Sequence, residues 1–140
     1  SFARDIGAVL TRVEPGVVEV ALPYRADLTQ QHGFLHAGIV ATILDSACGY
    51  AAFSLMAANV AVLTVEYKIN LLRPAQGDRF AARAHVVRAG QTLTVCSADA
   101  FAQTGAAEKL IATIRHGVRR ARARRSKAVA PRESPRLALG

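Results

Sequence analysis

The chain has 140 residues, of which 51% are hydrophobic, and its formal net charge is +8. This length allows one compact domain with a real core and is too short for two. The two cysteines, Cys48 and Cys96, lie far apart and form no CxxC pair, so nothing supports a disulfide framework or a zinc ribbon.

The positive charge is concentrated at the C-terminal end. Residues 1–117 contain ten Lys and Arg against nine Asp and Glu, whereas residues 118–140 contain eight against one. We therefore predict a nearly neutral domain over residues 1–117 and a basic, largely disordered tail over residues 118–140. No aromatic residue is interleaved with the arginines, which argues against nucleic acid as a partner. The alternative to an incidental basic end is contact with nucleic acid or an acidic surface.

The first residues, SFARDIGAVLTRVEPG, carry Arg4 and Asp5 where a secretory signal peptide needs an apolar segment. We expect a short amphipathic helix here, and a reducing, cytoplasmic setting. After a Pro15–Gly16 turn, residues 17–24 alternate between apolar and polar side chains. This period of two predicts a half-buried strand.

Residues 38–56 have apolar side chains at helical spacing and a second stripe formed by Gly38, Thr42, Asp45 and Gly49. The pattern predicts a long buried helix with one carboxylate in its middle. Asp45 is also the single charge in the apolar stretch 38–65. Because an aspartate near the centre of a membrane-spanning helix costs about 2.5 to 3.5 kcal/mol, we expect a core helix and no membrane contact.

The remainder of the domain is predicted to be strands, separated by turn signals around residues 74–77, 89–90 and 105. The four predicted strands are residues 61–75, 78–88, 92–104 and 107–116. Short connections favour antiparallel pairing. A strongly curved antiparallel sheet wrapped around one central helix is therefore the simplest α+β architecture.

One motif resembles a known family. Residues 36–45, HAGIVATILD, and their small-residue continuation SACGYA resemble the H-G-G-x6-D signature of hotdog-fold acyl-CoA thioesterases of the PaaI (phenylacetic acid degradation) type, in the 4-hydroxybenzoyl-CoA thioesterase superfamily. The stretch VEYKINLLRPAQGD is similar to the strand that follows the helix in those proteins, and Gln30 stands where many relatives carry Asn or Gln. The resemblance covers residues 1–115 and implies a hotdog fold. Ala37 replaces the first glycine of the signature, which is acceptable if its φ is negative.

The residue types of this motif suit thioester chemistry. Amides near Gly38, at a helix N-terminus, can bind the developing oxyanion of a thioester carbonyl. Asp45, two turns further along the same face, can activate water or attack the thioester directly. The resemblance implies that Gln30, His36 and Gly38 of one subunit meet Asp45 and Thr64 of its dimer partner. Gln30 would then polarise the carbonyl with Gly38, Thr64 would orient the water, and His36 would fix the turn.

The resemblance also implies an acyl-CoA substrate, no cofactor other than that coenzyme A, and a homodimer that pairs into a dimer of dimers. Arg73, Arg88 and Lys109 are candidates to bind the phosphates of coenzyme A, with solvated surface charge as the alternative for each. Acyl-chain preference and the choice between direct attack and general-base catalysis stay open. The alternative function is a non-catalytic, regulatory module that binds acyl-CoA.

Several of these residues also have other interpretations. Asp45 can also be a buried structural carboxylate. His32 and His36 could bind a metal with Asp45, but Gly33 between them predicts a loop, and no metal is expected. Cys48 lacks the sequence of a nucleophile elbow, so we expect a small core residue. Hotdog dehydratases pair a histidine and an aspartate in a different local motif, which is not found here.

Overall fold

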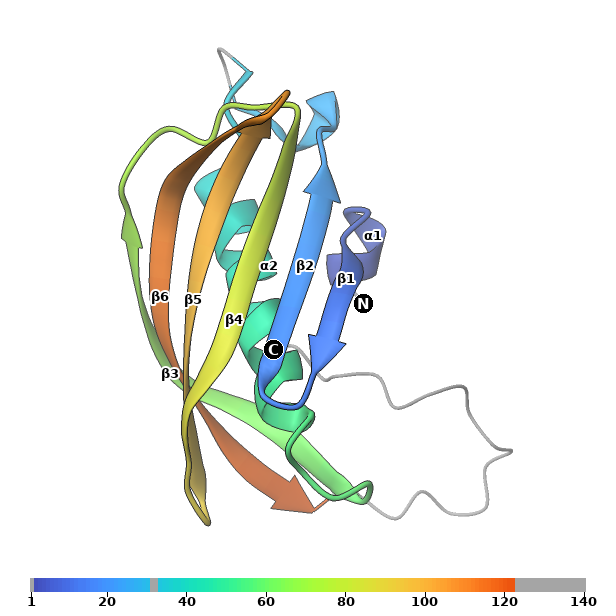
Figure 1. Cartoon of the computed structure of the whole chain (residues 1–140), viewed down its shortest axis with the longest axis vertical. Helices are drawn as coiled ribbons and strands as arrows, with labels where there is room; N and C mark the ends of the chain where they lie inside the picture. Colours follow the sequence, from blue (N-terminus) through green and yellow to red (C-terminus); the bar gives the residue numbers. More distant parts are fainter. Residues whose placement is uncertain (1, 31–32, 123–140) are drawn as a thin grey trace, which may run out of the picture.

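The computed structural model describes residues 2–30 and 33–122. Figure 1 shows one antiparallel sheet whose strands lie in the order β1-β2-β4-β5-β6-β3. Its strands are β1 (Val9–Glu14), β2 (Val17–Pro23), β3 (Val60–Leu71), β4 (Arg79–Ala89), β5 (Leu93–Thr104) and β6 (Ala107–Arg122). The helices are α1 (Phe2–Asp5), the 3-10 helix η1 (Ala26–Leu28) and α2 (Ala37–Phe53).

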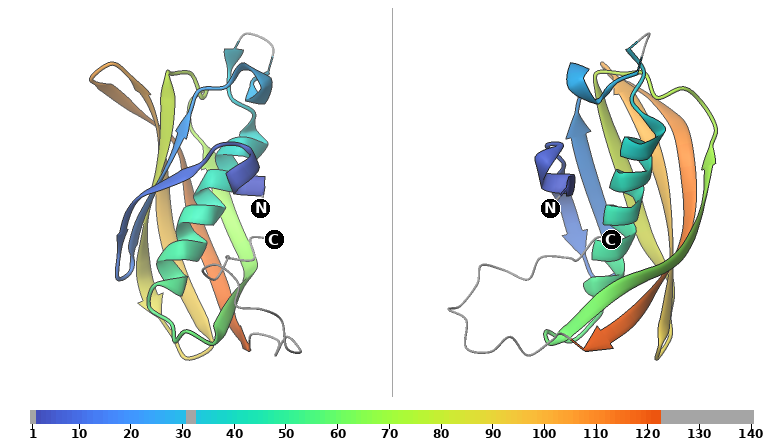
Figure 2. Two further views of the ribbon diagram at one scale, coloured as in Figure 1. Left: turned by 90° about the vertical axis from the view of Figure 1, so that its right-hand side faces the viewer. Right: turned by 180° about the vertical axis from the view of Figure 1, so that it is seen from behind.

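The sheet curves around α2, which lies along its concave face in both views of Figure 2. Each pair of neighbouring strands is antiparallel. The predicted architecture, a curved sheet around one long helix, is therefore confirmed. β3, the first strand after α2, pairs with the last strand β6, and its other edge has no strand partner among the described residues.

Alternating side chains explain why these segments form strands against the helix. In β2, Val18, Val20 and Leu22 are buried while the residues between them are partly exposed. β5 follows the same period of two from Thr94 to Ala102. One face of each strand thus contributes to the core and the other meets solvent.

β6 is longer than the sequence pattern predicts. The predicted boundary at residue 117 falls inside this strand, which continues to Arg122. Val118 is buried and pairs with Thr64 on β3 and Thr94 on β5. The arginine run does not end the strand, because Arg119 and Arg120 are exposed while their backbones stay in the ladder. The rest of the predicted tail, residues 123–140, lies outside the described residues.

The N-terminal segment differs from the helix predicted for residues 1–16. The helix α1 ends at Asp5, Gly7 has a φ of +86°, and Val9–Glu14 form the edge strand β1 against β2. A left-handed glycine is a common helix terminator. Beyond it, pairing with β2 satisfies the backbone of this segment more completely than a short isolated helix would.

Small side chains line the contact between α2 and the sheet, which we call the alanine-lined interface. Each of its members is buried, and none is larger than cysteine. They are Ala47, Cys48, Ala51 and Ala52 on α2, and Ala82, Ala84, Ala98, Ala100, Ala102 and Ala112 on the strands. The helix and the sheet can therefore approach closely.

None of the helices in the described part of the chain is both long enough and apolar enough to cross a membrane.

Candidate active site

Asp45 is held at the point where three elements meet. Its carboxylate on α2 accepts a hydrogen bond from Thr64 Oγ1 of β3 at 3.1 Å, and its contact with His116 Nε2 of β6 is 2.5 Å. Both contacts end on Oδ1. The side chain of Asp45 is 12% exposed. In the part of the chain that the structure describes, both partners thus bind Oδ1, which leaves Oδ2 as the oxygen available for chemistry.

His116 was not among the predicted site residues. It occupies an inward position of β6 between Ile114 and Val118, and its side chain is fully buried. Its Nδ1 has no hydrogen-bond partner among the described residues. The ring of Tyr67, its neighbour on β3, lies parallel to it at a centroid distance of 6.1 Å. A signal was present in the sequence, since a histidine on the apolar side of an alternating strand needs a polar partner.

The start of α2 presents free backbone donors. His36 is the N-cap residue, and its carbonyl accepts hydrogen bonds from the amides of Ile39 and Val40. The amides of Ala37 and Gly38 have no backbone acceptor among the described residues. Apart from its chain neighbours and the backbone of α2, no atom of the described residues lies within 4 Å of the place where a Cβ on Gly38 would stand. A ligand can therefore approach these donors.

The geometry of this turn bears on the expectations for Ala37 and His36. Ala37 is the first residue of α2, so its backbone is helical and its φ is negative, as the departure from the glycine signature requires. The side chain of His36 is exposed and makes no capping hydrogen bond. His36 therefore contributes to the turn through its backbone, which also binds the carbonyl of Leu28.

A cavity of about 350 Å³ opens beside the helix start. Gln30 and Ala37 line it together with Arg73, whose guanidinium donates to the carbonyl of Leu110 at 2.8 Å. The backbone hydrogen bonds from Gln30 to Phe34 and from Leu35 to Ala75 hold the loop over the cavity. The structure thus brings together Gln30, the helix start and Arg73.

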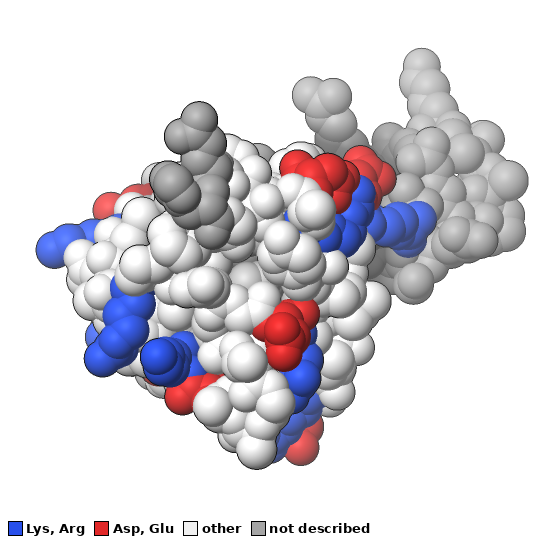
Figure 3. Space-filling model, turned by 90° about the horizontal axis from the view of Figure 1, so that it is seen from above, with Lys and Arg blue, Asp and Glu red and all other residues white. Residues whose placement is uncertain are grey.

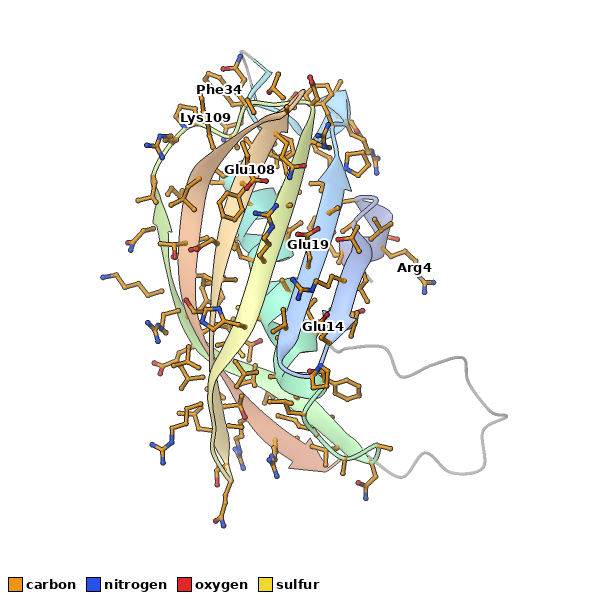
Figure 4. All side chains as sticks on the ribbon, viewed as in Figure 1. Arg4, Glu14, Glu19, Phe34, Glu108 and Lys109 are labelled. Atoms are coloured by element: carbon orange, nitrogen blue, oxygen red, sulfur yellow. The ribbon has the colours of Figure 1, made fainter. Side chains whose placement is uncertain are left out.

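A second, larger cavity of about 650 Å³ lies at the same end of the molecule and includes Lys109 in its lining. Figure 4 shows Lys109 and Phe34 close to this end. Neither Asp45 nor the start of α2 lines it. Viewed from above, acidic and basic side chains lie close to one another on a mostly uncharged surface (Figure 3). This mixture agrees with the small net charge of residues 1–117.

One chain does not bring all the predicted residues together. Gly38 and Asp45 are seven residues apart on α2, which is about 10 Å along the helix axis. Asp45 does not line the cavity that holds Gln30. A carbonyl bound by the Gly38 amide therefore lies far from the carboxylate of the same chain. Arg88 is exposed on β4 opposite Val95, several residues along the sheet from Arg73.

The two cysteines have no nucleophilic character. Cys48 and Cys96 are fully buried. Burial raises the pKa of the Cys48 thiol well above its usual value and that of Cys96 to about 11. The expectation that Cys48 is a core residue is confirmed.

The metal site weighed above included His32, which lies outside the described residues. Within the described part of the chain, no group of three His, Cys, Asp or Glu side chains could hold a metal ion.

Comparison with known proteins places this geometry in a family. A family model described as the thioesterase superfamily matches residues 32–109, which is more than half of the chain. The chain belongs to the thioesterase superfamily. This match contains Asp45, Thr64 and the start of α2, but it ends before His116.

The crystal structure of a thioesterase family protein from Silicibacter pomeroyi shares 55% sequence identity with this member of the thioesterase superfamily. That structure superimposes with a TM-score of 0.84 over 86% of this chain and 89% of the other. A conserved protein from Pseudomonas aeruginosa, with 26% identity, superimposes with a TM-score of 0.78 over 86% of this chain and 94% of its own. The hotdog fold is thereby confirmed.

Curated relatives include acyl-coenzyme A thioesterase 13 of Homo sapiens, which is 31% identical over 118 residues, 83% of this chain and 82% of the relative. A protein of Halobacterium salinarum is 38% identical over 97 residues, 64% of this chain and 62% of its own length. The chain thus spans about six tenths of the length of its archaeal relatives.

Proposed function

We propose that this chain hydrolyses acyl-CoA thioesters to the free acid and coenzyme A, and that it does so as a homodimer. The observation that carries the proposal is the carboxylate of Asp45, bound on Oδ1 by Thr64 and His116 and placed at the family spacing from the free amide of Gly38. The relationship to acyl-coenzyme A thioesterase 13 supports coenzyme A thioesters as the substrate class.

A second copy of the chain resolves the separation within one chain. Each copy presents a carbonyl-binding turn at Gly38 and a carboxylate at Asp45, about 10 Å apart along the helix. A two-fold axis brings the turn of one copy to the carboxylate of the other. One edge of β3 has no strand partner among the described residues, and Leu63, Val65 and Tyr67 on this strand are each about half exposed. Both features support joining the sheets there. We also propose that two such dimers associate into a dimer of dimers.

The chemistry follows from these positions. The thioester carbonyl accepts hydrogen bonds from the Gly38 amide and the Gln30 side chain, so that negative charge developing on its oxygen is stabilised. Oδ2 of the partner's Asp45 removes a proton from the attacking water while the Thr64 hydroxyl helps to orient it. The tetrahedral intermediate then expels the coenzyme A thiolate, which takes up the proton. In the direct route, Oδ2 attacks the carbonyl carbon and the coenzyme A thiolate leaves. Water then hydrolyses the resulting anhydride to the free acid and the Asp45 carboxylate.

Substrate binding uses the cavity beside Gln30. Its volume of about 350 Å³ is suited to aryl or aliphatic acyl groups of small or medium size. Arg73 borders this cavity and is the better candidate to bind a phosphate of coenzyme A. Arg88 is the weaker candidate, because it stands well away from the cavity. The reaction needs no cofactor besides the coenzyme A of the substrate.

The test is thiol release from phenylacetyl-, benzoyl-, butyryl- and hexanoyl-CoA. We expect the wild type to turn over at least one of them, and Asp45→Asn to lower kcat by about 100-fold or more because the isosteric amide cannot act as base or nucleophile. The control is Asp99→Asn, which changes a half-buried carboxylate on β5 outside the site and should keep kcat within about twofold.

Two results would contradict the proposal. Full activity of Asp45→Asn would remove the catalytic role of the carboxylate. Binding of acyl-CoA without turnover by the wild type would instead favour the non-catalytic binding module.

A further inference from the structure

His116 lies against the proposed catalytic carboxylate but outside the residues that the family model matches. We propose that His116 is a positioning residue for the thioesterase reaction: its imidazole donates Nε2–H to Asp45 Oδ1 and so turns Oδ2 toward the substrate. This inference rests on the proposed function and adds to it a residue on the last strand.

The surroundings of the ring decide which nitrogen donates. Nδ1 is buried and has no hydrogen-bond partner among the described residues. Nε2 instead faces a carboxylate oxygen, which accepts. The proton of this contact therefore sits on Nε2, where Asp45 Oδ1 accepts it across 2.5 Å.

The contacts of Asp45 explain what this bond does. Thr64 and His116 both approach Oδ1, at 3.1 Å and 2.5 Å, from two adjacent strands. With one oxygen fixed from two directions, the carboxyl group cannot rotate freely about its terminal torsion, and Oδ2 keeps one direction. The contact from His116 is the shorter of the two, and the His116 side chain is more deeply buried than that of Thr64. Loss of this orientation should slow the chemical step much more than it weakens substrate binding.

The position of the imidazole is itself fixed. His116 pairs with Cys96 on β5 and with Tyr67 on β3, and the Tyr67 ring lies parallel to it. Its own side chain has no exposure to solvent. His116 is among the residues that line a cavity of about 230 Å³, but its side chain offers no exposed surface to a substrate there. We therefore assign it a positioning role and not that of a general acid or base.

Two substitutions separate the hydrogen bond from the packing. His116→Gln keeps an N–H donor near the place of Nε2, whereas His116→Leu fills a similar volume without a donor. The control is His85→Gln, because His85 is an exposed histidine on β4. For each protein, kcat and KM are measured with the best acyl-CoA substrate, and urea unfolding verifies the fold.

We expect His116→Leu to lower kcat by about 10- to 100-fold, the range for losing a hydrogen bond to a charged group, with KM within about threefold. His116→Gln should recover kcat to within about fivefold of the wild type, and His85→Gln should leave it unchanged. A purely structural histidine would not give this rescue. If His116→Leu does not fold, the His116→Gln variant and the spectrum described next still decide.

Imidazole ¹⁵N NMR of the wild type tests the hydrogen bond between His116 and Asp45 and does not depend on turnover. It should show the ring protonated at Nε2, and Asp45→Asn should shift that signal. A ring protonated at Nδ1 alone, a His116→Leu variant as fast as an active wild type, or a folded His116→Gln variant as slow as His116→Leu would each overturn the inference. A wild type that hydrolyses no acyl-CoA overturns the proposed function instead, and the spectrum still tests the hydrogen bond between His116 and Asp45.

Discussion

The strongest electrostatic prediction concerns a network on the outer face of the sheet. Arg83 on β4 binds Glu108 through two hydrogen bonds of 2.7 Å and Glu19 on β2 through a third of 2.7 Å. Its guanidinium also lies 4.6 Å from the centre of the Phe101 ring on β5. The network therefore connects four neighbouring strands, and Figure 4 shows its two carboxylates. The perturbation is Glu108→Gln, which removes the charge and keeps the shape.

The size of the effect follows from the pKa of Glu108. Hydrogen bonds from Arg83 and Gln103 lower this pKa from 4.5 to about 2. A difference of that size between folded and unfolded chain corresponds to at most about 3.4 kcal/mol at neutral pH. The side chains of Glu108 and Arg83 are 32% and 43% exposed, so solvent screens the pair and we expect about 1 kcal/mol.

The sign of the pH dependence is fixed as well. Because the pKa of folded Glu108 lies below its unfolded value, the contribution is complete above pH 4.5 and disappears as the pH falls towards 2. Urea unfolding at pH 7, 5 and 3 should therefore show wild type and Glu108→Gln converging in free energy of unfolding as the pH falls.

The matched control for this experiment is Glu14→Gln, since the Arg12–Glu14 pair is 57% and 55% exposed and should contribute little. The reasoning is refuted if Glu108→Gln costs no more than Glu14→Gln, or if its cost is the same at pH 3 as at pH 7.

Two further predictions concern the site and the core. Thr64→Val should lower kcat by about 10-fold, because it removes the hydroxyl that binds Asp45, while Thr64→Ser should keep kcat within about twofold of the wild type. Steady-state thiol release measures both variants. Equal rates for the two would exclude a role for the hydroxyl. Cys48 and Cys96 should react with a chromogenic disulfide at pH 8 about 1000-fold more slowly in the native protein than in urea. The reason is that both thiols are buried and their pKa values are raised. A native thiol that reacts within seconds would contradict their burial.

The helix and most strands could be predicted because one periodicity dominates each segment. The helical spacing over residues 38–56 and the alternation over residues 17–24 are set by local burial, which the sequence records directly. β1 could not be predicted in this way, because all six of its residues are exposed and its strand conformation depends on pairing with β2. The end of β6 was hidden by its arginines, which face solvent from a ladder that the flanking strands maintain.

The candidate site was predictable as far as local motifs reach. Gly38 and Asp45 belong to one helix, and their spacing is readable from the chain. His116 is 71 residues from Asp45, and only the strand order, which puts β6 between β5 and β3, brings the two together. The resemblance placed Thr64 in one site with Asp45 to orient the water, but it did not predict the hydrogen bond between the two side chains. Which residues of a second chain complete the site stays a prediction.

The alanine-lined interface has a consequence for how variants of this fold would behave. Long side chains can absorb an added methylene by changing rotamer, but alanines have no rotamer to change, so a larger residue there must move α2 relative to the sheet as a body. Asp45 travels with the helix, while Thr64 and His116 stay with the strands. Ala100 lines none of the three cavities described above. Larger residues at such positions should therefore change the turnover rate from a distance, and selection for altered rates in this scaffold should find them.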